Sequence, residues 1–154
     1  MNRTTRFFVA VAFSFTATLA AEGQWQTDYD KALATAKAEG KNVFINFTGS
    51  DWCGPCIAMH NRVFSQKQFL DYAAKHLILV EVDYPKRKTL PKQIQQQNVE
   101  LKYEFHINRL GFPTIALVDS FGKVLGTSTG YNDETPAAIV ARIEKWAKRP
   151  PDVF

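Results

Sequence analysis

Cysteine is almost absent from this sequence, with two residues in 154, Cys53 and Cys56. A single pair cannot build a disulfide framework that holds a fold together, so these two thiols act with each other. Proline and glycine are also scarce and scattered, seven and eight residues, which excludes collagen-like and low-complexity chains. The charge excess is only +4, and twelve Phe, five Tyr and three Trp exclude intrinsic disorder. The sequence therefore predicts one packed globular domain.

The amino-terminal segment carries no acidic residue and leads into an apolar run. Residues 1–6 contain two arginines, residues 7–21 are predominantly apolar, and the run ends in small residues at Ala20 and Ala21. This order is typical of a secretory signal peptide. A membrane anchor needs about 20 apolar residues, so an anchor is the weaker alternative. We predict a signal peptide over residues 1–21 and a single domain over residues 22–154.

Strands and helices are predicted to alternate along the domain. Three nearly continuous apolar runs predict strands buried on both faces, at residues 41–47, 77–83 and 114–118. A turn at residues 119–122 predicts a final hairpin. Helical periodicity predicts helices over residues 28–39 and 66–75, and from Cys53, Pro91 and Pro136 onward. Thr27 is the expected cap of the first helix, and Ser65 with Gln68 forms an expected capping box. This pattern predicts an α/β fold, a central mixed β-sheet flanked by helices on both faces.

The two cysteines are separated by Gly54 and Pro55 and follow a predicted strand, which places Cys53 at the start of a helix. Unpaired backbone N–H groups at a helix start favour a thiolate. Two intervening residues let the sulfurs meet across the first helical turn, and Pro55 is compatible with that turn. We expect the pair to cycle between dithiol and disulfide, with the more exposed Cys53 as the nucleophile and Cys56 resolving the mixed disulfide.

Three other uses of the cysteine pair stay open from the residues alone. A permanent structural disulfide is compatible with an oxidising compartment, although so short a loop gains little from chain entropy. Zinc needs about four ligands, and the cysteines are joined only by His60, His76 and His106. Copper(I) held by both thiolates and one histidine is the sharper metal alternative, because soft thiolates suit this ion. We expect no metal, and no cofactor beyond the redox-active disulfide Cys53–Cys56.

The segment Asn46 to Cys56 reads NFTGSDWCGPC, and it is followed by Gly111-Phe112-Pro113-Thr114 and by DSFGK at residues 119–123. This combination resembles the thioredoxin family. It looks closest to exported, single-domain thioredoxin-like proteins, which are similar to the soluble catalytic domain of transmembrane disulfide reductases. The resemblance covers nearly the whole of residues 22–154. A lone CxxC would be a weak signal, whereas WCGPC followed by Pro-Thr about sixty residues later is specific.

The resemblance implies roles for the residues around the pair. Pro113 matches the family's cis-proline, which packs against the active-site disulfide, and the backbone of Phe112 would pair with an extended substrate segment. Trp52 matches the aromatic residue that flanks the nucleophile, and Gly130 matches a glycine that keeps the docking surface low; the two motifs are completed by Gly54, Pro55 and Thr114. From the residues alone, two simpler alternatives stay open. Pro113 could be an ordinary proline at the start of a strand, and Trp52 could be an aromatic residue that only packs in the fold.

Two positions depart from the family pattern. Family members often carry a buried carboxylate beneath the second cysteine, and the matching residue here is Asn46, which cannot act as a base. Water or a nearby carboxylate such as Asp51 would then accept the proton of Cys56. The stretch of residues 107–110 before Gly111 is longer than the family's usual connection to the proline.

A basic run at Lys86-Arg87-Lys88 lacks interleaved aromatic residues and any nucleic-acid motif. We expect a solvated loop there that would steer an acidic partner protein, and no nucleic-acid partner.

The resemblance implies an exported thiol:disulfide oxidoreductase, in the bacterial periplasm or secreted into an equivalent space. The Gly-Pro dipeptide between the cysteines resembles reducing members, which implies that the protein reduces protein disulfides and is re-reduced by a membrane-embedded electron donor. The alternatives are a disulfide oxidase or isomerase of the same fold, and a non-catalytic copper- or zinc-binding module. We expect a monomer, because the reaction needs an open face around Trp52 and Phe112.

Overall fold

The computed structural model describes residues 24–148 of the chain. The predicted signal peptide, residues 1–21, lies outside the described residues, and so do the outermost residues of the predicted domain. The described part begins with a short segment in which Gln26 forms an isolated parallel bridge with Val80. No helix within residues 24–148 combines the length and the apolar character that crossing a bilayer requires.

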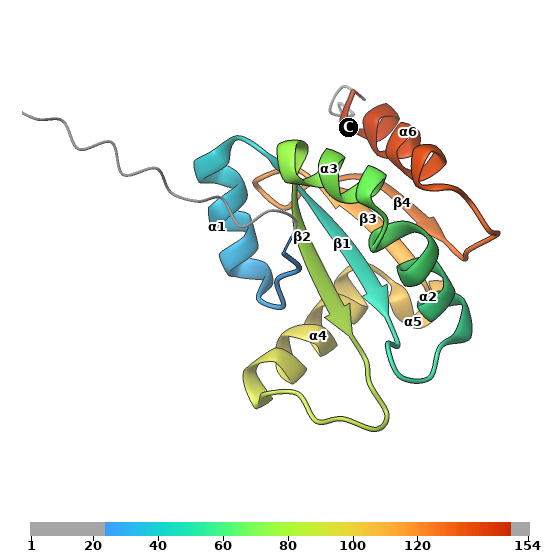
Figure 1. Cartoon of the computed structure of the whole chain (residues 1–154). Helices are drawn as coiled ribbons and strands as arrows, with labels where there is room; N and C mark the ends of the chain where they lie inside the picture. The colour runs from blue at the N-terminus through green and yellow to red at the C-terminus, as the bar shows by residue number, and fades with distance from the viewer. Residues whose placement is uncertain (1–23, 149–154) are drawn as a thin grey trace, which may run out of the picture.

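The described residues form a four-stranded sheet with the strand order β2-β1-β3-β4 (Figure 1). The strands are β1 (Asn42–Thr48), β2 (Leu77–Asp83), β3 (Thr114–Val118) and β4 (Val124–Thr129). β1 is parallel to β2 and antiparallel to β3, and β3 and β4 form an antiparallel hairpin. The sheet is therefore mixed, and the strands predicted from the three apolar runs are confirmed to within one residue.

Helices cover both faces of the sheet (Figure 1). Side chains alternate along β1, so Val43, Ile45 and Phe47 pack in a core with α1 and α4, while Phe44 packs in a second core with η1, α3 and α6. The predicted fold class is confirmed. The helical segments are α1 (Tyr29–Glu39), α2 (Gly54–Met59), the π-helix η1 (His60–Phe64), α3 (Lys67–His76), α4 (Lys92–Glu104), α5 (Ile107–Leu110) and α6 (Pro136–Ala147).

The caps of the first and third predicted helices differ from the expectation. Asp28, not Thr27, caps α1, because its side chain accepts the backbone N–H of Lys31 at 3.0 Å. The predicted capping box at Ser65 is wrong. Its hydroxyl donates to the carbonyl oxygen of Asn61 at 2.9 Å, so Ser65 closes the preceding π-helix, and α3 begins without a side-chain cap.

The connection between α4 and β3 also differs from the expectation. Pro91 stands just before α4 rather than at its first helical position. Residues 107–110, predicted as a long connection, form the short helix α5, which the chain enters through His106 in a left-handed conformation with φ of 56°. The side chain of Ile107 is buried in the core shared with α1 and α4, and this burial favours the extra turn.

Three strand ends meet at one edge of the sheet. The register pairs Thr48 at the end of β1 with Asp83 at the end of β2, and Phe47 with Thr114 at the start of β3. The segments that leave or enter the sheet at this edge are residues 49–53, 84–91 and 111–113. Both cysteines and the Phe112–Pro113 motif therefore lie at the same end of the molecule.

Candidate active site

Cys53 and Cys56 form a disulfide at the amino end of α2, with their Cα atoms 5.2 Å apart. Cys53 caps the helix, and the backbone N–H of Cys56 points at the Cys53 Sγ with N and S 3.4 Å apart. Such a donor favours a thiolate on Cys53 once the disulfide is reduced. Both residues are buried in the oxidised form, 6% and 3% exposed, so the cap position distinguishes Cys53 from Cys56 more than exposure does. The intervening Gly54 and Pro55 form an exposed first turn of α2.

The Phe112–Pro113 peptide bond is cis and leads directly into β3. The buried hydroxyl of Thr114 donates to the carbonyl oxygen of Gly111 at 2.8 Å, which closes this loop on itself. Gly130 follows β4 and donates its backbone N–H to the carbonyl oxygen of Pro113 at 2.8 Å. Its φ of 86° favours glycine, and a Cβ added there would meet nothing within 4 Å. The surface beside Pro113 is therefore open at Gly130.

Three aromatic side chains from separate segments make contact beside the cysteines. The Trp52 ring stands edge-on to Phe112 with 5.7 Å between centroids, and Phe112 lies 5.2 Å from Tyr84. The indole N–H of Trp52 donates to the carbonyl oxygen of Tyr84 at 2.7 Å. We call Trp52, Tyr84 and Phe112 the aromatic platform. Trp52 is 37% exposed, so the platform presents apolar surface to solvent next to Cys53.

Gly49 lets the Trp52 ring lie directly on the backbone of the loop after β1. A Cβ added at Gly49 would lie 2.4 Å from Cε2 of Trp52, far inside van der Waals contact. The carbonyl oxygen of Gly49 also accepts the backbone N–H groups of Trp52 and Cys53, at 3.2 and 2.9 Å. The position of the tryptophan therefore depends on a residue without a side chain three positions earlier.

A buried carboxylate holds the same loop from the neighbouring strand. Asp83 is 5% exposed and accepts both the backbone N–H of Ser50 at 2.9 Å and its hydroxyl at 2.6 Å. Lys88 forms an ion pair with Asp83 at 2.8 Å, and this hydrogen bond raises the pKa of Lys88. Asn98 on α4 donates to the carbonyl oxygen of Asp83 at 2.8 Å. Asp83 thus ties the cysteine loop to the end of β2 and to α4.

The carboxylates near the pair differ in their suitability as proton acceptors. Asp51 accepts the backbone N–H groups of Lys86 and Arg87 at 2.9 and 2.7 Å, and these bonds lower its pKa. A carboxylate with a lowered pKa is a weak base, so Asp51 is poorly suited to deprotonate Cys56. Asn46 is buried, and the register places Glu81 beside it on the same face of the sheet. Burial, and then repulsion by Asp83, raises the pKa of Glu81.

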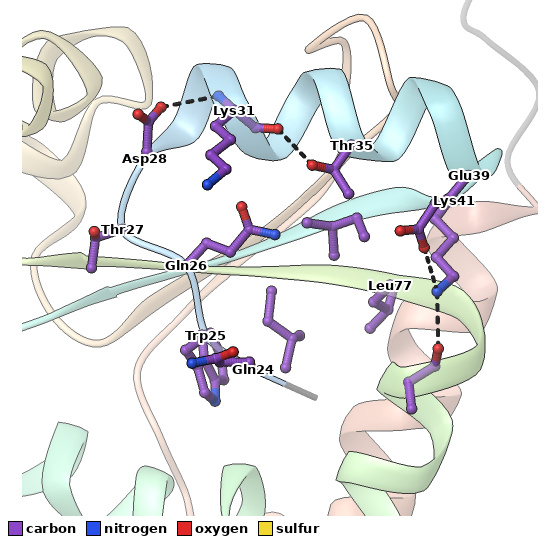
Figure 2. A pocket seen from close by; sticks show the side chains of 13 residues that line it. Gln24, Trp25, Gln26, Thr27, Asp28, Lys31, Thr35, Glu39, Lys41 and Leu77 are labelled. Atoms are coloured by element: carbon purple, nitrogen blue, oxygen red, sulfur yellow. Dashed lines mark hydrogen bonds and ion pairs between the residues drawn. The ribbon is translucent and has the colours of Figure 1, made fainter. Parts of the chain in front are cut away.

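A pocket of about 500 Å³ lies away from this chemistry, between α1, the segment around Gln26 and the amino end of β2 (Figure 2). Lys41 lines one end of this pocket (Figure 2). It forms an ion pair with Glu39 at 2.8 Å and donates a hydrogen bond to the carbonyl oxygen of Ala74 at 3.0 Å. The cysteines, in contrast, follow the carboxyl end of β1. Within residues 24–148, no group of three or more His, Cys, Asp or Glu side chains is arranged to hold a metal ion.

Residues 24–120 match the model of the family described as thioredoxin-like. The chain belongs to this thioredoxin-like family. Disulfide bond reductase DsbH of Chlamydia pneumoniae is 36% identical over 129 residues, which cover 84% of this chain and 75% of that protein. The thiol:disulfide interchange protein DsbD of Vibrio cholerae is 31% identical, over 71% of this chain but only 17% of DsbD.

Comparison with solved structures supports the thioredoxin-like fold. A DsbH oxidoreductase superposes with a TM-score of 0.75 at 31% identity, covering 97% of this chain and 96% of that one. A thioredoxin from Thermus thermophilus, 20% identical over 81% of this chain and 87% of its own, has a TM-score of 0.60 and shares the fold. With Cys53 and Cys56 joined at the start of α2, the chain is a thioredoxin-like thiol:disulfide oxidoreductase, as the sequence predicted.

Sequence reasoning placed the two contiguous motifs but missed the residues that hold them. Tyr84, Asp83 and Gly49 were not singled out, although a signal for Asp83 existed. It ends the second buried strand, and the carboxyl ends of parallel strands meet at one edge of a sheet. Nothing in the sequence indicated that the Trp52 ring would lie against Gly49, since that contact depends on the path of the loop.

Proposed function

We propose that this protein is exported and reduces disulfides in other proteins through Cys53 and Cys56. The observation that carries the proposal is the disulfide at the cap of α2, beside an exposed Trp52 and the Phe112–Pro113 loop. Two observations support electron transfer from this protein to its substrate: the Gly54-Pro55 dipeptide between the cysteines, and a relative that bears the name disulfide bond reductase.

The reaction transfers two electrons from the reduced pair to the substrate. The Cys53 thiolate attacks one sulfur of a substrate disulfide, so a mixed disulfide forms and the other substrate sulfur leaves as a thiolate. Cys56 then loses its proton and attacks the Cys53 sulfur. The second substrate thiolate leaves, both substrate thiolates take up protons, and the protein holds the Cys53–Cys56 disulfide seen here.

The residues around the pair would position the substrate. The backbone of Phe112 would pair with an extended substrate segment, in the manner of strand addition. Trp52 would contact one side of the substrate segment. On the other side, Pro113, Thr114 and Gly130 would form a surface without protruding side chains. Hydrogen bonds from Thr114 to Gly111 and from Gly130 to Pro113 fix this loop against the β3–β4 hairpin.

Such a reductant needs a source of electrons. An exported protein works where disulfides persist, so its own pair must be re-reduced after each turnover. A membrane-embedded electron donor would meet this need by reducing the Cys53–Cys56 disulfide. The signal-peptide pattern of the amino-terminal segment fits a location in the periplasm. The open face around the cysteines would serve donor and substrate in turn, which favours a monomer.

The reduction potential of the Cys53/Cys56 pair tests the direction. The chain lacking residues 1–21 is equilibrated with glutathione buffers, and the fraction of free thiol is measured. We expect a value near about −270 mV, as in thioredoxin. A value near about −120 mV would instead make the protein an oxidant or isomerase. Replacing Cys56 by serine should trap a mixed disulfide with a substrate such as insulin, whereas Cys53→Ser should trap none.

A further inference from the structure

Two lysine side chains lie over rings of the aromatic platform. The ammonium group of Lys86 lies 4.2 Å from the centroid of the Trp52 ring, and that of Lys102 lies 5.5 Å from the centroid of Tyr84. Arg87 follows Lys86 and is exposed. We call Lys86, Arg87 and Lys102 the cationic rim. Because Trp52 directly precedes Cys53, the rim holds positive charge next to the reactive sulfur.

Few carboxylates balance the cationic rim. None of its three side chains takes part in an ion pair within the described part of the chain. Asp83 is already paired with Lys88, and Glu81 is partly buried on the sheet. Asp51 accepts backbone N–H groups of the rim and lies near enough to Arg87 for that charge to lower its pKa. Because no rim cation is held in an ion pair within residues 24–148, the surface beside Cys53 keeps a positive charge.

Aromatic rings, rather than acidic side chains, position two of these cations. A ring attracts an ammonium group through its quadrupole but does not neutralise its charge as a carboxylate would. The ammonium groups of Lys86 and Lys102 therefore stay available to the carboxylates of another molecule. The aromatic platform supplies apolar contact and the rim supplies charge, at the place where a substrate must lie to bring its disulfide to Cys53.

We propose that this face selects disulfides that lie in acidic segments of partner proteins. An extended segment with Asp or Glu next to its cysteine would lay apolar atoms on the aromatic platform and carboxylates beside Lys86 and Lys102. The attraction increases the association rate and weakens with salt, because the Debye length falls from about 10 Å at 0.1 M to about 3 Å at 1 M. This inference rests on the proposed function, since it concerns the substrates of the same cysteine pair.

Two synthetic peptides test the selectivity. Each contains one intramolecular disulfide, and they differ only in the residues that flank the cysteines, glutamate in one and lysine in the other. The second-order rate of reduction by the pre-reduced protein is divided by the rate with dithiothreitol, an uncharged reductant, which removes the peptides' own difference in reactivity. We expect the acidic peptide to react about tenfold faster at low salt, since two exposed ion pairs each contribute a few fold. The difference should largely disappear at about 1 M salt.

Charge-reversal variants locate the source of the preference. Lys86→Glu should lower the acidic-to-basic rate ratio about tenfold, and Lys102→Glu on α4 should lower it as well. Lys123→Glu is the matched control, with the same change of charge. Lys123 is exposed in the turn between β3 and β4, at the opposite end of β3 from Pro113. The control variant should keep the ratio of the unmodified protein.

The outcomes separate this inference from the proposed function. Equal normalised rates for both peptides would overturn the selectivity while leaving the reductase intact. A ratio that falls equally in the Lys86→Glu and Lys123→Glu variants would show an effect of overall charge and would also overturn it. Failure to reduce either peptide would overturn the proposed function itself, and the selectivity with it.

Discussion

The contact between Gly49 and the Trp52 ring makes a sharp test of how the active-site loop is built. In the variant Gly49→Ala, the new Cβ would lie 2.4, 2.5 and 2.7 Å from Cε2, Nε1 and Cζ2 of Trp52. Ordinary contacts of a Cβ are 3.4–4 Å, so the ring must move by about 1 Å. The backbone of Gly49 has no positive φ, so alanine brings no conformational strain of its own.

The cost of moving the ring follows from what the ring contacts. The shift breaks the hydrogen bond from the Trp52 indole N–H to Tyr84, worth about 1 kcal/mol. It also loosens the edge-on contact with Phe112, worth a further ~1 kcal/mol. The expected loss of about 2 kcal/mol lies within the usual range for overpacking. For a domain of this size it corresponds to a fall in Tm of about 8 °C.

Thermal and urea unfolding of the oxidised protein would measure this loss, with two comparisons. Gly54→Ala is the control, because a Cβ there meets nothing within 4 Å, and it should be neutral or slightly stabilising. In a Trp52→Ala background the clash is gone, so Gly49→Ala should cost close to nothing there. An equal cost of Gly49→Ala with and without the tryptophan would refute the reasoning, as would no cost at all.

Three further variants test other parts of the structure. Gly126→Ala should destabilise the domain by about 2 kcal/mol, because its Cβ would lie 2.2 Å from Cγ of the Trp146 ring; an unchanged urea midpoint would contradict this packing. Asp83→Ala should cost about 2–3 kcal/mol through the lost bonds to Ser50, and Lys88→Ala less than about 1 kcal/mol because Lys88 is half exposed; equal losses in urea unfolding would contradict this. Glu81 has a raised folded-state pKa, so the folded protein holds its proton more tightly and stability falls as pH rises from the ordinary carboxyl pKa through the folded one. Glu81→Gln should therefore be more stable than the unmodified protein at pH 7, and the two Tm values should converge below about pH 4; a variant that is less stable at neutral pH would contradict this.

Strand positions were predictable because their signal is local. A run such as residues 77–83 is stable only when both faces are covered, and the sequence itself displays that requirement. Helix starts were less predictable. Thr27 and Asp28 are adjacent and both suited to capping, and the path of the chain from the Gln26 bridge decides which one is used. Ser65 likewise had the right neighbours for a capping box. Its hydroxyl instead donates to the carbonyl oxygen of Asn61 in the preceding π-helix.

The sequence by itself determined the redox pair, its surrounding motifs and the fold class. Trp52 to Cys56 is contiguous, and the chemistry of two thiols at a helix start needs no distant residue. What holds and flanks that pair was decided only by the tertiary structure. The parallel register of β1 and β2 brings Asp83, Tyr84 and Lys86 to the cysteine loop from more than 30 positions away in the chain. These contacts are not encoded locally, because they arise from the pairing of strands that α2, η1 and α3 separate along the chain.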